Sequence, residues 1–175
     1  NKNIPHEISQ AKDAGKKVVV FLGHQSPIHW FVSHLDIISS WSAQVSFLEE
    51  IIKFSKSFDN IFIIIRYKNL NWTANLHFKN ILDKIKNCEN IIISTNQSEA
   101  GYAYKLCANA DLVVAKHTSV VDECLCHEIP VLIYEYTHNM RGIISEAFDY
   151  SASGLLCYNF EELLEKSKTL LFDNS

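Results

Sequence analysis

Residues 110–135 have the sequence ADLVVAKHTSVVDECLCHEIPVLIYE, which contains a strand, a helix and a second strand in that order. The run 111–115 is almost wholly apolar, residues 120–125 repeat apolar side chains at helical spacing, and Pro130 introduces a second apolar run at 131–134. Runs that are apolar at successive positions are typical of strands buried on both faces, as in parallel sheets. This stretch therefore predicts one strand–helix–strand unit of a parallel α/β sheet.

The same alternation extends outward on both sides of this unit. Further β-rich runs are predicted at 17–22 (KVVVFL), 60–67 (NIFIIIRY), 90–94 (NIIIS) and, more weakly, 154–158 (GLLCY). Segments with apolar residues at helical spacing lie between or after these runs, at 47–58, 78–85, 103–110 and 163–171. The repeated order of strand and helix predicts a doubly wound, Rossmann-like parallel sheet of about six strands, with helices on both faces.

Length and composition favour one globular domain. The chain has 175 residues, of which 47% are hydrophobic and 21% are charged. We expect the polar residues 1–16 to form an arm or linker, and residues 17–175 to form a single domain. A formal net charge of −4 gives no sign of a nucleic-acid partner. No apolar run reaches the length of roughly 18 residues that a membrane span needs.

The cysteines indicate a reducing compartment. They are five in number, at positions 88, 107, 124, 126 and 157. An odd count without a repeated spacing does not fit a disulfide framework, so we expect a cytoplasmic protein. The cluster Cys124-x-Cys126-His127 lacks a second ligand pair at zinc-like spacing, so no metal site is expected there.

In a sheet of this kind, ligands bind beyond the carboxyl ends of the strands, so the loops after the strands are the candidate site. The loop 115–119 precedes a helix, whose N-terminus attracts phosphate through its unpaired N–H groups and partial positive charge. Thr118 and Ser119 add hydroxyl groups there, and Lys116 or His117 adds a cation. This loop therefore predicts a phosphate seat.

Glu123 follows Ser119 by four residues and so lies one helical turn further along the same face. A carboxylate in that place can accept two hydrogen bonds from the diol of a ribose. A phosphate seat followed by a diol acceptor is what a nucleotide requires. The alternative interpretation is that Ser119 only caps the helix and that Asp122 completes a capping box.

The loops after the first two strands add further candidates. Arg66 and Lys68 follow the second strand and are placed to bind a diphosphate, although a charged strand end in water is an equal alternative. Gly23 after the first strand permits close backbone approach. The loop has neither the G-x-G-x-x-G spacing of an ordinary NAD dehydrogenase nor a Walker-type G-K-S/T, which argues against both classes.

The residues 110–135 resemble the carboxyl-terminal lobe of GT-B fold glycosyltransferases, above all those of bacterial surface and capsular polysaccharide biosynthesis. They are more distantly similar to sialyl-, Kdo- and glycerophosphate-transferases and to UDP-sugar 2-epimerases. The order of segments fits over 17–172, while the specific motif is confined to 110–135. The resemblance implies that 17–175 is a nucleotide-sugar-binding domain and that the enzyme's N-terminal lobe lies outside this chain.

The resemblance also implies roles for individual residues. Thr118 and Ser119 would contact the phosphates of the donor, and Glu123 its ribose. Arg66 and Lys68 would fall where these families place a basic residue, often in a His-Pro pair. Here Lys68-Asn69 stands in place of that pair.

The loop 95–101, with Gln97, would lie near the base. Asn139 would lie near the sugar or the cleft between the lobes.

The expected reaction is transfer of a sugar from the nucleotide-sugar to a hydroxyl of a glycan or lipid-linked acceptor. Hydrogen-bond donors directed at the leaving phosphate would stabilise its growing charge without a metal or cofactor. His24 and His117 are the candidates for proton transfer. Because the other lobe is expected to supply the general base, this chain is expected to bind donor but to be inactive alone.

Two alternatives remain. The first is the carboxyl-terminal half of a UDP-sugar 2-epimerase-like enzyme, which keeps the same donor seat. The second is a non-catalytic binding or regulatory domain of flavodoxin-like topology, although Leu22-Gly23-His24 lacks the acidic cluster that a receiver domain requires. Membrane contact is compatible with a polysaccharide enzyme, but no basic amphipathic helix indicates it.

Overall fold

The computed structural model describes residues 4–23, 41–116, 118–135, 150 and 153–173. Within them the chain forms a parallel sheet of six strands in the order β3-β2-β1-β4-β5-β6. The predicted Rossmann-like fold class is confirmed, and each predicted run contains a strand. The strands are β1 (Lys17–Leu22), β2 (Ile61–Arg66), β3 (Ile91–Ile93), β4 (Leu112–Ala115), β5 (Val131–Tyr134) and β6 (Leu156–Cys157).

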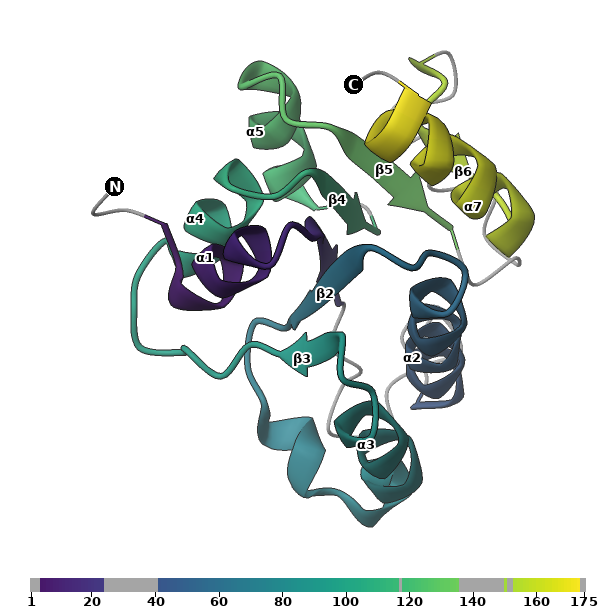
Figure 1. Cartoon of the computed structure of the whole chain (residues 1–175). Coiled ribbons are helices and arrows are strands. Elements are labelled where there is room, and N and C mark those ends of the chain that lie inside the picture. The colour runs from purple at the N-terminus through teal and green to yellow at the C-terminus, as the bar shows by residue number, and fades with distance from the viewer. Residues whose placement is uncertain (1–3, 24–40, 117, 136–149, 151–152, 174–175) are drawn as a thin grey trace.

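Helices cover both faces of the sheet, as Figure 1 shows. On one face lie α1 (His6–Asp13), α4 (Tyr102–Ala108) and α5 (Ser119–Cys126). On the other face lie α2 (Trp41–Ser55), α3 (Lys79–Lys86) and α7 (Phe160–Lys168). Two short 3-10 helices, Asn71–Ala74 and Leu76–Phe78, precede α3, and a π-helical turn, Thr169–Asp173, ends the described chain.

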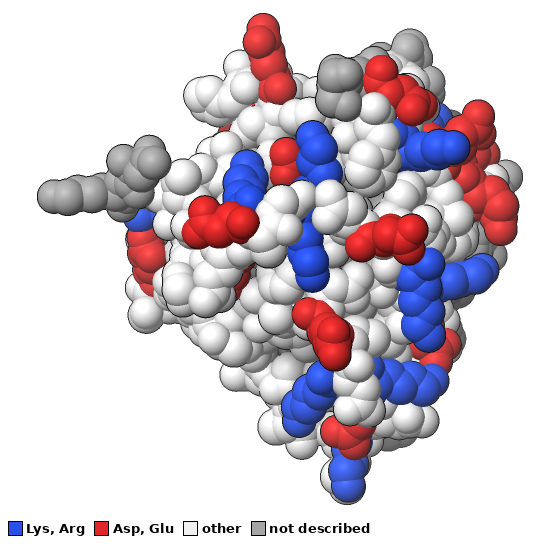
Figure 2. All heavy atoms as spheres, viewed as in Figure 1, with Lys and Arg blue, Asp and Glu red and all other residues white. Residues whose placement is uncertain are grey.

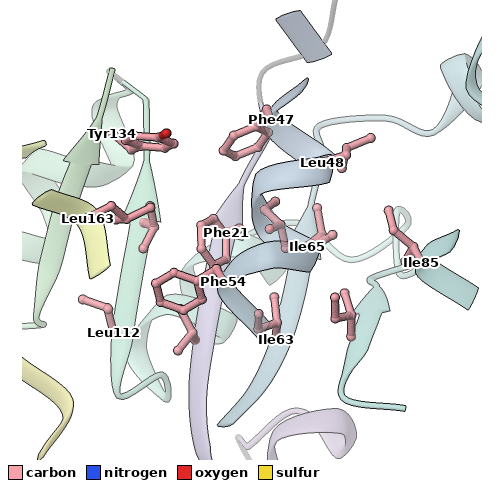
Figure 3. Close-up of a cluster of buried hydrophobic side chains, with 14 of the residues drawn as sticks. Phe21, Phe47, Leu48, Phe54, Ile63, Ile65, Ile85, Leu112, Tyr134 and Leu163 are labelled. Carbon is pink, nitrogen blue, oxygen red and sulfur yellow. The ribbon is translucent and has the colours of Figure 1, made fainter. Parts of the chain in front are cut away.

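The period of two along the strands divides the core into two layers. In β1, Val19 and Phe21 face the layer under α2, whereas Val18 and Val20 face the layer under α1 and α4. Phe21 packs edge-on against Phe54 of α2, with ring centroids 5.2 Å apart. Figure 3 shows this cluster around Phe21, with side chains from the strands and from α2 directed into one layer.

The register of the sheet brings several strand ends to one edge. Leu22 at the end of β1 pairs with Arg66 of β2 on one side and with Ala115 of β4 on the other. Strands β2 and β3 follow β1 toward one edge of the sheet, whereas β4, β5 and β6 follow one another toward the other edge. The strand order therefore reverses between β1 and β4, which is where ligands bind in open α/β sheets.

The segment that we expected to be an arm or linker contains α1, which packs on the sheet. Ile8 and Ala11 of this helix are buried in the same layer as Val18 and Val20 of β1. The polar composition of residues 1–16 concealed this contact, because a helix as short as α1 needs only these two apolar positions to dock. In the described part of the chain, no helix is long and apolar enough to cross a membrane.

Candidate functional site

A cavity of about 450 Å³ opens at the carboxyl ends of β1, β2 and β4. It lies at the reversal of strand order and is bordered by the beginnings of α4 and α5. Its lining brings together a set of residues that the sequence nominated from three separate loops, namely Gly23, Arg66, Lys68, Thr118 and Ser119. Tyr102 and Tyr104 from α4 complete the opposite wall.

The start of α5 faces this cavity without a side-chain cap. Thr118 is the N-cap residue, in an extended conformation with φ −159° and ψ 150°, and its side chain makes no capping hydrogen bond. Ser119 is the first helical residue and is exposed. The capping-box interpretation is therefore wrong: the cap falls on Thr118, and Asp122 instead accepts a hydrogen bond from the hydroxyl of Tyr150. Both hydroxyl groups of the turn line the cavity.

Arg66 lies at the end of β2 and is only 9% exposed. Its Nη1 donates a hydrogen bond of 2.6 Å to the carbonyl of Asn96, and its Cζ lies 5.7 Å from the centroid of the Tyr102 ring. Burial lowers the pKa of Arg66, while Tyr102 and Glu7 act in the opposite direction. A guanidinium remains protonated in proteins, so the cavity contains a fixed positive charge.

Gln97 holds the basic residues instead of lining the cavity. With its amide oxygen toward Arg66, it accepts from Nη1 at 2.7 Å and donates to the carbonyl of Lys68 at 2.7 Å. The amide of Gln97 therefore links the end of β2 to the loop that follows it. The expected contact of Gln97 with a base stays a prediction. Lys68 itself is exposed, and its ammonium group forms no ion pair within the described residues.

Gly23 lines the cavity, and the space left by its missing side chain is filled by the ring of Tyr67. A Cβ atom placed on Gly23 would lie 2.3 Å from Cζ of Tyr67. The Tyr67 ring is buried and packs at 4.7 Å, centroid to centroid, from the ring of Trp72. The glycine therefore makes room for an aromatic ring in the cavity wall.

Lys116 does not add a cation to the cavity, contrary to the sequence-based expectation. It is 3% exposed, and its Nζ lies 3.7 Å from Oε1 of Glu135, which is also buried. Burial lowers the pKa of Lys116 to about 8, against the opposing effect of Glu135. At the end of β4 the side chain turns into the protein beside β5, because the ion pair with Glu135 offers it a partner there.

Glu123 lies in a second hollow of about 310 Å³ between α4 and α5. This hollow shares Tyr104 and Val120 with the main cavity, so the two are adjacent. The Glu123 carboxylate is a hydrogen-bond partner of the Tyr104 hydroxyl and raises its pKa. Glu123 is thus placed beside the cavity, one turn beyond Ser119, and its proposed ribose contact stays a prediction.

Three candidates, His24, His117 and Asn139, lie outside the described residues. Conversely, the sequence did not nominate Tyr102 and Tyr104, which line the cavity, or Glu7, which contacts Tyr102. The stripe in 103–110 had suggested only a buried helix face. A tyrosine pair at spacing two near a helix start was the only available signal, and it carries little information alone.

Charges of both signs are interspersed over the face drawn in Figure 2, with no large patch of one sign. Within this mixed surface, Arg66, Lys68 and the start of α5 bring positive charge together at the cavity.

No family model matches this chain, and no curated protein matches it. Two solved structures resemble it over 97% of its length. One is a protein from Listeria monocytogenes described as a UDP-N-acetylglucosamine 2-epimerase, at 17% identity and a TM-score of 0.61. The other is the S. aureus MnaA-UDP co-structure, at 11% identity and a TM-score of 0.64. The shared feature is the fold. The chain spans 39% and 40% of the lengths of those two chains, which is about two fifths.

Proposed function

We propose that this chain is the nucleotide-sugar-binding lobe of a two-lobed enzyme and that UDP is the nucleotide it binds. The observation that carries the proposal is the cavity between β1 and β4, where Arg66, Lys68 and the start of α5 converge from separate loops. A buried guanidinium, an exposed ammonium group and helix N–H groups suit a diphosphate, because each stabilises negative charge from a different direction.

The adjacent hollow supports the nucleoside half of this ligand. Glu123 lies one helical turn from Ser119 and beside the cavity, at a spacing that suits a ribose joined to a phosphate at the helix start. Tyr104 borders both spaces and offers an aromatic face at their junction. A ligand with a polar diphosphate and a flatter, partly apolar nucleoside fits this sequence of surfaces.

Between the two reactions considered, the solved structures favour the epimerase-like one. One of the two similar structures is described as a UDP-N-acetylglucosamine 2-epimerase, and the other contains bound UDP. We therefore propose inversion at the sugar C2 of a UDP-sugar as the activity of the whole enzyme. The motif at 110–135 favours sugar transfer to an acceptor hydroxyl, which is the second candidate.

Isothermal titration of the 175-residue chain with UDP, CDP, GDP, UMP and uridine tests the binding proposal. We expect UDP to bind most tightly and uridine weakly, because uridine lacks the diphosphate. A chain that is folded by circular dichroism and binds none of these compounds would exclude the proposal.

The reaction is tested on the enzyme that includes both lobes, incubated with UDP-N-acetylglucosamine alone and with added acceptor. Formation of the C2 epimer without an acceptor supports the epimerase. Sugar consumption that requires an acceptor supports the transferase.

A further inference from the structure

Helix α1 contacts the candidate site through one carboxylate, that of Glu7. Glu7, in the first turn of α1, accepts a hydrogen bond of 2.7 Å at Oε2 from the hydroxyl of Tyr102. Ninety-five positions separate these two residues in the sequence. Figure 1 shows α1 beside α4, the helix that Tyr102 begins. Glu7 itself does not line the cavity.

Tyr102 connects this carboxylate to the guanidinium in the cavity. The Tyr102 side chain is 6% exposed, lines the cavity, and presents its ring 5.7 Å from Cζ of Arg66. Asn96 joins the same cluster, because its carbonyl accepts from Arg66 and its side chain is a hydrogen-bond partner of the Tyr102 hydroxyl. Besides its hydrogen bonds to Asn96 and Gln97, Arg66 therefore contacts a ring whose hydroxyl is held by Glu7.

We propose that Glu7 is a positioning residue for diphosphate recognition: it fixes the hydroxyl of Tyr102, and the Tyr102 ring in turn keeps Arg66 directed into the cavity. The inference rests on the proposed function, since it requires a diphosphate next to Arg66. Docking of α1 on the sheet is thereby coupled to the binding of phosphate.

Glu7→Gln and Tyr102→Phe test this coupling, with Glu161→Gln as the control. Glu161 is an exposed residue of α7 on the opposite face of the sheet, and its substitution changes the net charge by the same amount. Titrations with UDP, UMP and uridine are made on each 175-residue variant. We expect both test variants to weaken UDP by about three- to ten-fold, UMP by less, and uridine not at all. The control should bind all three like wild type.

The same substitution in an Arg66→Met background separates positioning from general destabilisation. If Glu7 acts through Arg66, Glu7→Gln has no further effect on UDP affinity once the guanidinium is gone. An equal loss for UDP, UMP and uridine, or an undiminished effect in the Arg66→Met chain, overturns the inference. If Tyr102→Phe fails to fold, Glu7→Gln in both backgrounds still decides the question.

The wild-type titration distinguishes failure of the inference from failure of the proposed function. A folded wild-type chain that binds no nucleotide overturns both. A wild-type chain that binds UDP, together with a Glu7→Gln variant of unchanged affinity, overturns only the role of Glu7.

Discussion

At the scale of single residues, Glu123 and Lys116 show how neighbouring groups decide what a charged side chain can do. Glu123 is exposed beside the Tyr104 hydroxyl at the junction of the two hollows. Lys116 precedes the start of α5 by only a few residues, yet it is buried against Glu135. The sequence predicts both to be polar site residues, but the partner that removes Lys116 from the cavity, Glu135, follows β5 and leaves no signal near Lys116 in the sequence.

Replacing Glu123 by alanine is expected to weaken UDP binding by about 1–3 kcal/mol, because a charged acceptor of the ribose hydroxyls is lost. The affinity is measured by isothermal titration of the folded variant. Glu165→Ala, an exposed glutamate of α7, serves as the control and should bind UDP like wild type. Unchanged affinity in a folded Glu123→Ala chain would remove the ribose assignment.

The buried Lys116 makes stability depend on pH in a definite direction. Burial lowers its pKa from the ordinary value of 10.5 to about 8 in the folded chain, so the unfolded chain holds the proton more tightly. The contribution of Lys116 to the free energy of unfolding should therefore rise with pH above 8, by about 1–2 kcal/mol between pH 8 and 9.5.

Urea unfolding of wild type and Lys116→Met across this pH range measures the effect as a difference. Because the pKa values of the buried Cys107 and Cys157 thiols are raised in the folded chain, both chains lose some stability over this range, and only the difference between wild type and Lys116→Met should rise with pH. The range ends below pH 10 because Tyr102 and Tyr150 have pKa values raised to about 12, which lowers stability once the unfolded tyrosines ionise. A parallel pH dependence in both chains would show that Lys116 is not the cause.

At the scale of elements, the start of α5 acts as an open helix end and not as a capped one. The sequence predicts the helix from its apolar stripe and places its start within one residue. Ser119 and Asp122 alone do not distinguish a phosphate seat from a side-chain cap. The outcome depends on the extended backbone of Thr118 and on the hydrogen bond that Tyr150 donates to Asp122. The 3-10 helices at 71–78 were also missed, since a single turn carries no period to detect.

Ser119→Ala distinguishes the two roles of this helix end. Because Ser119 is not the cap residue, its loss should change the free energy of unfolding by less than about 0.5 kcal/mol. UDP affinity should fall, since a hydroxyl donor to phosphate disappears. Urea unfolding and isothermal titration measure the two quantities, with the exposed Ser57→Ala, far from the cavity, as a control for affinity alone. A stability loss of about 1 kcal/mol with intact affinity would instead indicate a cap.

At the scale of the whole molecule, the sequence predicts the fold well and the cavity only in part. Alternating apolar runs and helical stripes are local patterns, so they specify the strands and the two helical layers. The cavity wall also contains Tyr102, whose hydroxyl meets Glu7 only after α1 and α4 pack on the same face. Contacts between residues so distant in sequence depend on packing that no single segment encodes.

Binding of UDP should stabilise the entire domain, because the cavity joins three strands and two helices. At a UDP concentration 100 times the dissociation constant, linkage predicts about 2.7 kcal/mol of added stability. For a chain of this length, that corresponds to a rise in melting temperature of about 5–10 °C. Thermal unfolding with UDP and with uridine at equal concentration measures it. A melting temperature that UDP leaves unchanged would contradict a site built from these elements.

The aromatic ring over Gly23 has an optical consequence. Tyr67 lines the cavity and packs against Trp72, an indole that is 4% exposed and therefore shielded from solvent quenching. A ligand that shifts the Tyr67 ring alters the surroundings of this indole, so the emission of Trp72 becomes a built-in reporter of occupancy. Trp72→Phe identifies its contribution among the three tryptophans of the chain. Gly23→Ala, which forces the same ring aside, should reproduce the spectral change without any ligand.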